Sequence, residues 1–200
     1  MHAQSRGEVT RNQILDVATR CFAQGGYDAV GVAEICRQAG VSKGAFYYHF
    51  ESKQTVFLES LSRWLRDFQH ALEATAAEAR TVPERLLKMS RLMSRVFGAD
   101  DSQTPMFLEF WTQASRDPAI RAATTAPYRS FQCFFADLIR QGIAEGTLAP
   151  GDPEAAAQTV ISLASGMLLQ GLLDPQGQDW GQVAERSMRI LLEGLGARSS

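Results

Sequence analysis

Residues 41–53 read VSKGAFYYHFESK, so two tyrosines, a histidine and a phenylalanine follow one another within a short polar segment. Ser42 is suited to be an N-cap residue, because its hydroxyl can accept a backbone N–H from the first turn of a helix over residues 43–49. Aromatic side chains crowded beside a lysine can fill a core, line a pocket or face a nucleic acid. The neighbouring segments distinguish between these uses.

Two more helices are predicted upstream of this one. The first carries apolar residues at helical spacing and stops at Gly25 and Gly26, and the second covers residues 32–39 and ends at Gly40. A helix, a short turn that contains glycine and a second helix together form the helix-turn-helix pattern. The sequence therefore predicts an N-terminal head of three helices with a helix-turn-helix.

The rest of the chain also reads as helices, and no strand-like alternation or internal repeat is evident. Residues 98–103 and 174–178 have the composition of loops. Helix starts are indicated by capping residues or by prolines suited to a first helical turn: Ser52, Pro83, Thr104, Asp117, Asp152 and Asp179. The predicted fold class is therefore all-α, with about nine helices.

The composition is that of a globular protein and disfavours several other classes. Hydrophobic residues make up 45% and charged residues 21%, so a disordered chain is not expected. The three cysteines are an odd number without CxxC spacing, which suggests neither a disulfide framework nor a zinc site and fits a reducing cytoplasm. The N-terminus lacks the apolar core of a signal peptide, and no apolar run is expected to reach the roughly 18 residues of a membrane span.

A helix-turn-helix places its second helix in the major groove of DNA, with the first turn against base edges. Here that first turn consists of Ser42, Lys43, Gly44 and Ala45. Small side chains permit a close approach, and Lys43 can donate to a guanine edge or to a phosphate. The net charge is −2, and residues 1–55 hold six basic against five acidic residues, so affinity for DNA has to come from local placement.

The aromatic residues of this segment divide between two faces of the predicted helix. Tyr47 lies one turn after Lys43, whereas Phe46 and Phe50 point to a different side. Phe46 and Phe50 are therefore predicted core residues. Tyr47, which carries a hydroxyl, is predicted to face the DNA backbone.

This part of the chain resembles the DNA-binding domain of the TetR/AcrR family of bacterial transcriptional regulators. The resemblance covers the run from about Arg11 to Phe57. Its matching pieces read ILDVATRCFAQGGYDAVGVAEICRQAGVSKGAFYYHFESKQTVF, in which the helix lengths, the turn, the aromatic block and Lys53 are in register. It departs at Gly31, where family members commonly have a threonine or serine cap that touches a phosphate. Cys36 replaces a usual alanine, which we expect to change the packing little. The rest of the chain agrees with the family only in being helical, of suitable length and ending in two long helices.

Together with the helix-turn-helix geometry, the resemblance implies a set of DNA-binding residues: Ser42, Lys43, Gly44, Ala45, Tyr47, Tyr48, His49 and Lys53. Lys53, at the start of the fourth helix, is expected to bind a phosphate. The alternatives are that Tyr47 is partly buried, that Tyr48 packs on the first helix, and that the histidine and lysines are surface residues without a role. Arg6 and Arg11 form either a basic arm or an ordinary tail.

The resemblance also implies a DNA-binding domain at residues 1–52 and a ligand-binding and dimerisation domain at residues 53–200. A helix-turn-helix that reads a palindromic operator needs a symmetric dimer. The last two helices are the predicted interface, because small residues at 164–166 among large apolar ones permit close packing in an intermolecular four-helix bundle, as in the family. An ordinary intrachain core is the alternative.

Aromatic and methionine residues in the C-terminal part suggest a pocket for a small, largely apolar effector, since such side chains line apolar pockets. The predicted ligand-binding residues are Met89, Met93, Phe107, Phe110, Trp111, Gln113, Phe131, Phe134, Met167 and Gln170. Residues at this helical spacing are also common in plain cores. The hypothesis is that the ligand favours a dimer whose recognition helices no longer match adjacent major grooves, which releases DNA.

Two other functions compete with a DNA-binding repressor. An enzyme is disfavoured because the sequence has no GxSxG, no HExxH and no phosphate-binding glycine loop, and its three histidines are isolated. No catalytic residue, metal or cofactor is therefore expected. The other is a helical interaction module whose head binds protein. Salt distinguishes the two kinds of binding, because DNA binding through several phosphates weakens steeply as salt rises.

Overall fold

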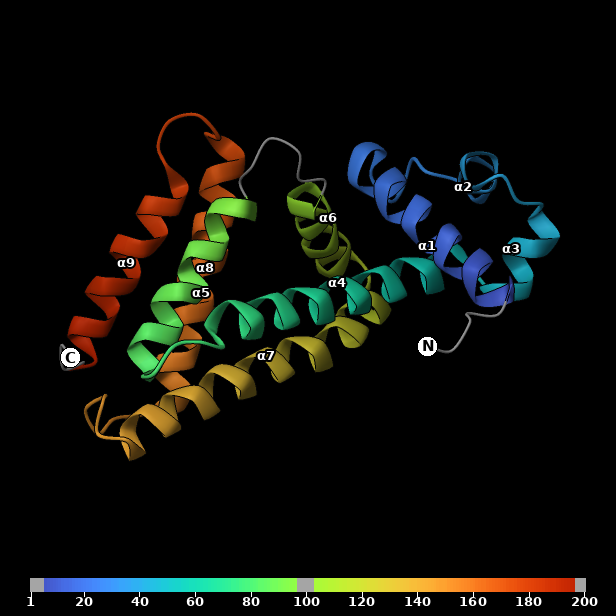
Figure 1. The fold of residues 1–200 in the computed structure, drawn as a ribbon. Coiled ribbons are helices and arrows are strands. Elements are labelled where there is room, and N and C mark those ends of the chain that lie inside the picture. Colours follow the sequence, from blue (N-terminus) through green and yellow to red (C-terminus); the bar gives the residue numbers. More distant parts are fainter. Residues whose placement is uncertain (1–5, 97–102, 197–200) are drawn as a thin grey trace. The chain divides into compact units, whose positions relative to one another are not determined.

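The computed structural model describes residues 6–96 and 103–196, apart from the side chains of residues 93–96, 103, 104 and 107. All regular structure in these ranges is helical, which confirms the predicted all-α class (Figure 1). The helices are α1 (Arg6–Gly25), α2 (Val32–Ala39), α3 (Lys43–His49), α4 (Lys53–Ala76), α5 (Val82–Val96), α6 (Gln103–Arg116), α7 (Pro118–Ala144), α8 (Pro153–Leu173) and α9 (Trp180–Gly194).

Side-chain caps begin several helices at the residues that the sequence indicates. Ser42 Oγ accepts the Ala45 N–H at 3.1 Å in the first turn of α3. Four further side chains accept backbone N–H groups at helix starts in the same way: Ser52, Asp117, Asp152 and Asp179. Most of the predicted loop at 98–103, and the side chain of Thr104, lie outside the described residues.

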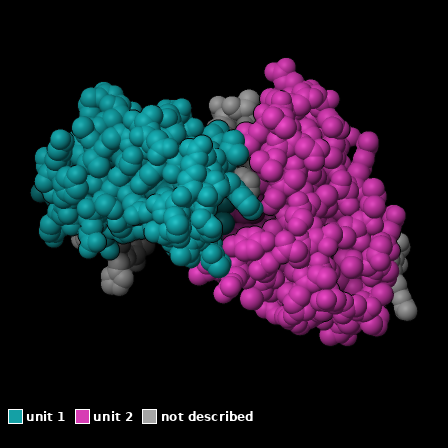
Figure 2. All heavy atoms as spheres, turned by 180° about the vertical axis from the view of Figure 1, so that it is seen from behind, with its two compact units in different colours: residues 1–66, 102–125 teal, residues 67–101, 126–200 magenta. Residues whose placement is uncertain are grey.

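The chain packs into two compact units (Figure 2). The first unit consists of residues 1–66 and 102–125, and the second of residues 67–101 and 126–200. Helices α4 and α7 therefore each contribute one part to each unit. The division at residue 52 into a DNA-binding and a ligand-binding domain remains a prediction, because packing alone does not show which segments carry which function.

An aromatic core holds the helix-turn-helix within the first unit. The core contains Phe22 of α1, Phe46 of α3, Phe50 at the C-cap of α3 and Phe57 of α4, all at most 1% exposed. Phe22 and Phe57 meet edge to face with ring centroids 5.4 Å apart, and the rings of Phe46 and Phe50 lie 5.9 Å apart. Burial of each such ring contributes about 1.5–3 kcal/mol. The three helices of the head and the start of α4 therefore share one core.

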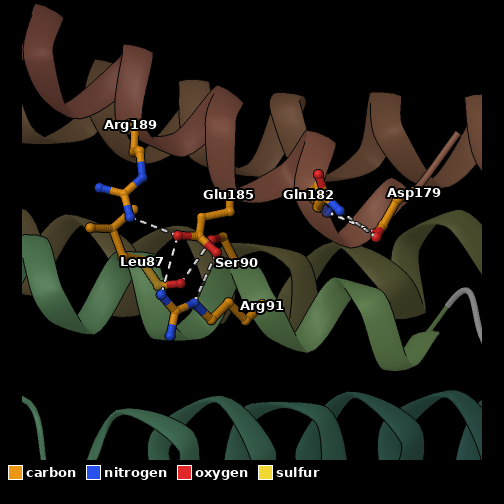
Figure 3. Close-up of polar contacts among 7 residues, drawn as sticks. All are labelled: Leu87, Ser90, Arg91, Asp179, Gln182, Glu185 and Arg189. Atoms are coloured by element: carbon orange, nitrogen blue, oxygen red, sulfur yellow. Dashed lines mark hydrogen bonds and ion pairs between the residues drawn. The ribbon is translucent and has the colours of Figure 1, made fainter.

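In the second unit, charged side chains join α5 to α9 (Figure 3). Arg91 of α5 donates to the Glu185 carboxylate of α9 through Nε at 3.0 Å and Nη2 at 3.2 Å. Arg189, one turn further along α9, donates to the same carboxylate at 2.7 Å. These hydrogen bonds from Arg91 and then Arg189 lower the pKa of Glu185 from its ordinary value of 4.5 to about 2.

Helix α8 is long and apolar enough, by length and composition, to cross a membrane, with a mean hydropathy of 1.4. By this measure the expectation that no apolar run reaches such a length is wrong. One helix of this kind is weak evidence, because a core helix of a soluble protein has the same composition. Val160, Met167 and Leu168 of α8 are buried, as core residues are.

Acid is expected to remove the contribution of Glu185 to stability. Its pKa is depressed in the folded chain, so the contribution is complete above 4.5 and is lost as the pH falls toward about 2. We expect Glu185→Gln to melt at a lower temperature than the wild type at pH 7, and the two melting temperatures to converge as the pH falls through this range. Thermal unfolding followed by circular dichroism measures the difference, with Glu193→Gln on the exposed side of α9 as the control. A gap that stays constant with pH would contradict the expectation.

Candidate nucleic-acid interface

The recognition helix α3 turns its two kinds of aromatic side chain in different directions. Phe46 is 0% exposed and lies in the core, as predicted, whereas Tyr47 is 54% and Tyr48 83% exposed. The alternative that Tyr48 packs on the first helix is therefore wrong. The His49 ring is half-buried and stands edge to face with Tyr48, with centroids 4.9 Å apart. The exposed face of α3 thus carries both tyrosines.

The first turn of α3 carries the remaining predicted contacts. Ser42, Lys43 and Gly44 are exposed, and Ala45 is half-buried. Ser42 already uses its hydroxyl oxygen as the cap of α3. Within the described part of the chain, neither the Ser42 hydroxyl proton nor the Lys43 ammonium donates a hydrogen bond. The turn therefore offers two hydrogen-bond donors beside small side chains. Their contact with DNA remains a prediction.

The turn between α2 and α3 depends on one glycine. Gly40 has φ of +64°, in the left-handed region that L side chains rarely adopt. The Val41 N–H donates to the Cys36 carbonyl at 3.0 Å and closes the end of α2. Cys36 is buried, and burial raises the pKa of its thiol. It therefore acts as a small apolar residue, as expected.

Helix α2 begins without a side-chain cap. Gly31 occupies the N-cap position with extended backbone and makes no side-chain hydrogen bond, which confirms the predicted departure. Glu34, in the first turn, accepts two hydrogen bonds from Arg37, at 2.9 Å and 2.5 Å. These bonds, together with one from Gln38, lower the pKa of Glu34 to about 2. The charge of Arg37 is thus engaged by Glu34 on the same helix.

Two other basic residues of the head contact groups within the first unit. Lys53 Nζ donates to the carbonyls of Tyr27 at 2.8 Å and Val30 at 3.1 Å, and lies 4.2 Å from the centre of the Tyr27 ring. The two carbonyls use two of the three N–H donors of the ammonium, which leaves one for a phosphate. Binding of a phosphate by Lys53 remains a prediction. Arg11 belongs to α1, pairs with Glu59 of α4 and stacks over the Phe50 ring.

The contacts that hold the loop between α1 and α2 are not predictable from the sequence. Glu109 of α6 accepts the Tyr27 N–H at 2.8 Å, although the two residues are 82 positions apart. No spacing rule connects residues so distant in sequence. The Glu34–Arg37 pair, in contrast, has the i, i+3 spacing that predicts such a bond on a helix.

The structure places the predicted ligand-binding residues in both units. In the first unit, Phe110 and Gln113 are buried and Trp111 is 53% exposed. In the second unit, Met89, Phe131 and Met167 are buried, Phe134 is half-buried and Gln170 is exposed. The side chains of Met93 and Phe107 lie outside the described residues. A role in ligand binding remains a prediction for the whole set.

Phe131 stacks on Phe68 within the second unit, with ring centroids 6.0 Å apart and the planes at 18°. Phe134 meets Phe135 edge to face at 5.1 Å. These two pairs place aromatic rings on α4 and α7 in the second unit. Among the described residues, no three histidine, cysteine or carboxylate side chains lie together as a metal site requires.

Two family models match the sequence. Residues 14–60 match the model described as bacterial regulatory proteins, tetR family. Residues 82–196 match the model described as BetI-type transcriptional repressor, C-terminal. The second match alone covers more than half of the chain.

Relatives with similar sequence or structure span nearly the whole chain. The transcriptional regulator UidR of Escherichia coli K12 is 23% identical over 199 residues, which cover 96% of this chain and 95% of that protein. A regulator of Saccharomonospora viridis, solved in complex with choline, is 25% identical with a TM-score of 0.79 and coverages of 93% and 96%. FadR of Bacillus subtilis, solved in complex with stearoyl-CoA, is 22% identical with a TM-score of 0.80 and coverages of 92% and 98%, which shows the shared fold.

Replacement of each glycine that flanks α2 by serine is expected to change the free energy of unfolding in opposite directions. No atom lies within 4 Å of an added Cβ at either Gly31 or Gly40, so the two sites differ in backbone conformation and not in space. Gly31→Ser supplies the missing cap in extended backbone and should stabilise the chain by about 0.5–1 kcal/mol. Gly40→Ser has to adopt a positive φ and should destabilise it by about 1 kcal/mol. Urea unfolding measures both changes, and destabilisation by Gly31→Ser would contradict the assignment of its N-cap position.

Proposed function

Because the chain belongs to the TetR/AcrR family of bacterial transcriptional regulators, we propose that it is a cytoplasmic repressor that binds a palindromic operator as a homodimer. In this proposal a small, largely apolar effector releases the operator. The observation that carries it is the exposed face of α3, where Tyr47 and Tyr48 stand outside a core that buries Phe46 and Phe50. Exposed aromatic side chains with hydrogen-bonding groups, beside Lys43, suit contact with DNA.

Exposed apolar residues on the last two helices support the homodimer. Leu169 and Leu173 of α8 are 45% and 87% exposed, and Ile190 of α9 is 70% exposed. Large exposed apolar side chains on neighbouring helices favour association with a second copy. A symmetric dimer places two recognition helices on half-sites about 34–36 Å apart.

The proposal of an apolar effector rests on the side chains of the second unit. Met89, Phe131 and Met167 are buried there, and Phe134, three residues after Phe131 on α7, is half-buried. Regulators of this family bind small molecules as well as DNA, and the relatives named above were solved with choline and with stearoyl-CoA. These ligands differ chemically, so the apolar character proposed for the effector comes from the residues of this chain. Repression follows the description of the C-terminal family model.

Sheared DNA of the source genome tests DNA binding directly. We expect the protein at moderate salt to retain fragments that share a palindrome with half-sites about one helical turn apart, and the affinity to fall steeply as salt rises. Tyr47→Ala should weaken binding to all sequences about tenfold, since it removes a phosphate contact. Lys43→Ala should also relax the preference at one base. Absence of enrichment, or binding that does not respond to salt, would favour the protein-interaction module instead.

Charge on the exposed face of α9 is expected to prevent dimerisation. Ile190→Asp places a carboxylate at a position where the isoleucine side chain is 70% exposed in the single chain, so the fold of the protomer should persist. The dimer should be lost, because the interface would have to bury the charge. The control is Leu108→Asp, which adds the same charge at an exposed apolar position of α6. Sedimentation equilibrium gives the mass of each variant. A dimeric Ile190→Asp with unchanged affinity between subunits would exclude this interface.

A further inference from the structure

The loop between α1 and α2 determines where the helix-turn-helix begins. It runs from Gly26, which has φ of +78°, to Gly31, the N-cap position of α2. Its internal bond, from the Val30 N–H to the Gly26 carbonyl, is long at 3.4 Å. Since no side chain caps α2, the first turn of that helix takes its position from the backbone of this loop.

Helix α4 holds the loop by binding two carbonyl groups of the loop. Lys53, the first residue of α4, donates from one ammonium to the carbonyls of Tyr27 and Val30, at the two ends of the loop. The same ammonium lies over the Tyr27 ring at 4.2 Å. Hydrogen bonds from a charged donor are stronger than those between neutral groups. Lys53 therefore fixes both the loop backbone and the ring that the loop carries.

Helix α6 holds the same loop by binding one of the loop's backbone N–H groups. Glu109 Oε1 accepts the Tyr27 N–H at 2.8 Å, and Glu109 Oε2 lies 3.6 Å from the place where a Cβ on Gly26 would stand. Gln113, one turn along α6 and only 5% exposed, donates to Glu109 Oε1 at 3.0 Å and to Asp28 at 3.3 Å. The buried amide of Gln113 thus orients the carboxylate that binds the loop.

Aromatic packing connects the held loop to the core. The Tyr27 ring lies 4.6 Å from the Phe57 ring and 5.6 Å from the Phe22 ring, and Phe57 in turn lies 4.5 Å from Phe110 of α6. Phe46 of α3 belongs to the same hydrophobic core. The loop, α6 and the helix-turn-helix are therefore joined by one aromatic core.

We propose that Glu109 and Lys53 are positioning residues for the helix-turn-helix, and that the Glu109 carboxylate on the Tyr27 N–H fixes the start of α2 and with it the orientation of the recognition helix. The proposal rests on the proposed function, since it concerns how the helix-turn-helix is held for DNA. Loss of the carboxylate would leave the Tyr27 N–H without its charged acceptor and loosen the start of α2. The Lys53 contacts hold the other side of the loop and keep it attached to α4.

Amide hydrogen exchange in the full chain without DNA tests the loop contacts. Glu109→Ala should raise the exchange rate at Tyr27 and in the first turn of α2 about tenfold, because it removes the acceptor. Glu109→Gln keeps a carbonyl oxygen that can accept the same N–H, so it should exchange nearly as the wild type does. Glu145→Ala in the second unit removes the same charge and should leave the loop unchanged. Equal exchange in Glu109→Ala and the wild type would overturn the proposal.

DNA binding then tests positioning, with the genomic fragments that the wild type retains as the probe. Glu109→Ala and Glu109→Gln lack the same negative charge, so any difference between them reports on the hydrogen bond and not on electrostatic attraction. We expect Glu109→Ala to bind about tenfold more weakly than Glu109→Gln. Equal affinities, with both melting temperatures preserved, would show that the contact does not position the recognition helix. If the wild type retains no DNA, the proposed function fails, while the exchange measurement still tests the contacts.

Lys53→Met separates positioning from phosphate binding, because methionine keeps an unbranched side chain without the charge. The proposal expects faster exchange at residues 26–31 in this variant even without DNA. A lysine that only binds a phosphate would leave exchange unchanged and lower the slope of log affinity against log salt by about 0.9. That second result would remove Lys53 from the set of positioning residues.

Discussion

The burial of Phe46 and Phe50 is the constraint on which the outer surface of α3 depends. A helix of seven residues is too short to be stable alone, so α3 keeps its conformation because these rings pack in the shared aromatic core of the first unit. With both rings turned inward, helical geometry directs Tyr47 and Tyr48 outward. The face proposed to bind DNA is therefore a consequence of the core, and Ser42 sets its register by fixing where the helix begins.

The sequence predicts the helix-turn-helix well because its signals are local. Capping oxygens and glycines act within about four residues of their own position, so the bounds of α2 and α3 follow from sequence alone. Lys53 shows where such reasoning stops. Its position at a helix start suggests a phosphate, whereas the fold brings two loop carbonyls within reach of its ammonium. Helical spacing likewise makes Phe110 part of an apolar pattern on a predicted helix. It cannot reveal that the Phe110 ring packs on Phe57.

In the second unit, α9 carries both charged contacts to α5 and an exposed apolar side chain. On α9, the Glu185 carboxylate accepts hydrogen bonds from Arg91 of α5 and from Arg189, while Ile190, the residue after Arg189, is exposed. The charged contacts orient α5 and α9 by directional hydrogen bonds, and apolar burial supplies most of the stabilisation. An exposed apolar face beside a specifically oriented pair of helices is compatible with the proposed homodimer, in which a second copy packs in one register.

The weak positive charge of the head makes orientation more important than attraction. Arg37 is engaged by Glu34 and Arg11 by Glu59, so these cations offer a phosphate less field than unpaired ones would. Affinity then depends on donors held at the right distance and angle, because hydrogen bonds weaken steeply when misaligned. A loop held by Glu109 from one helix and by Lys53 from another provides that fixed geometry.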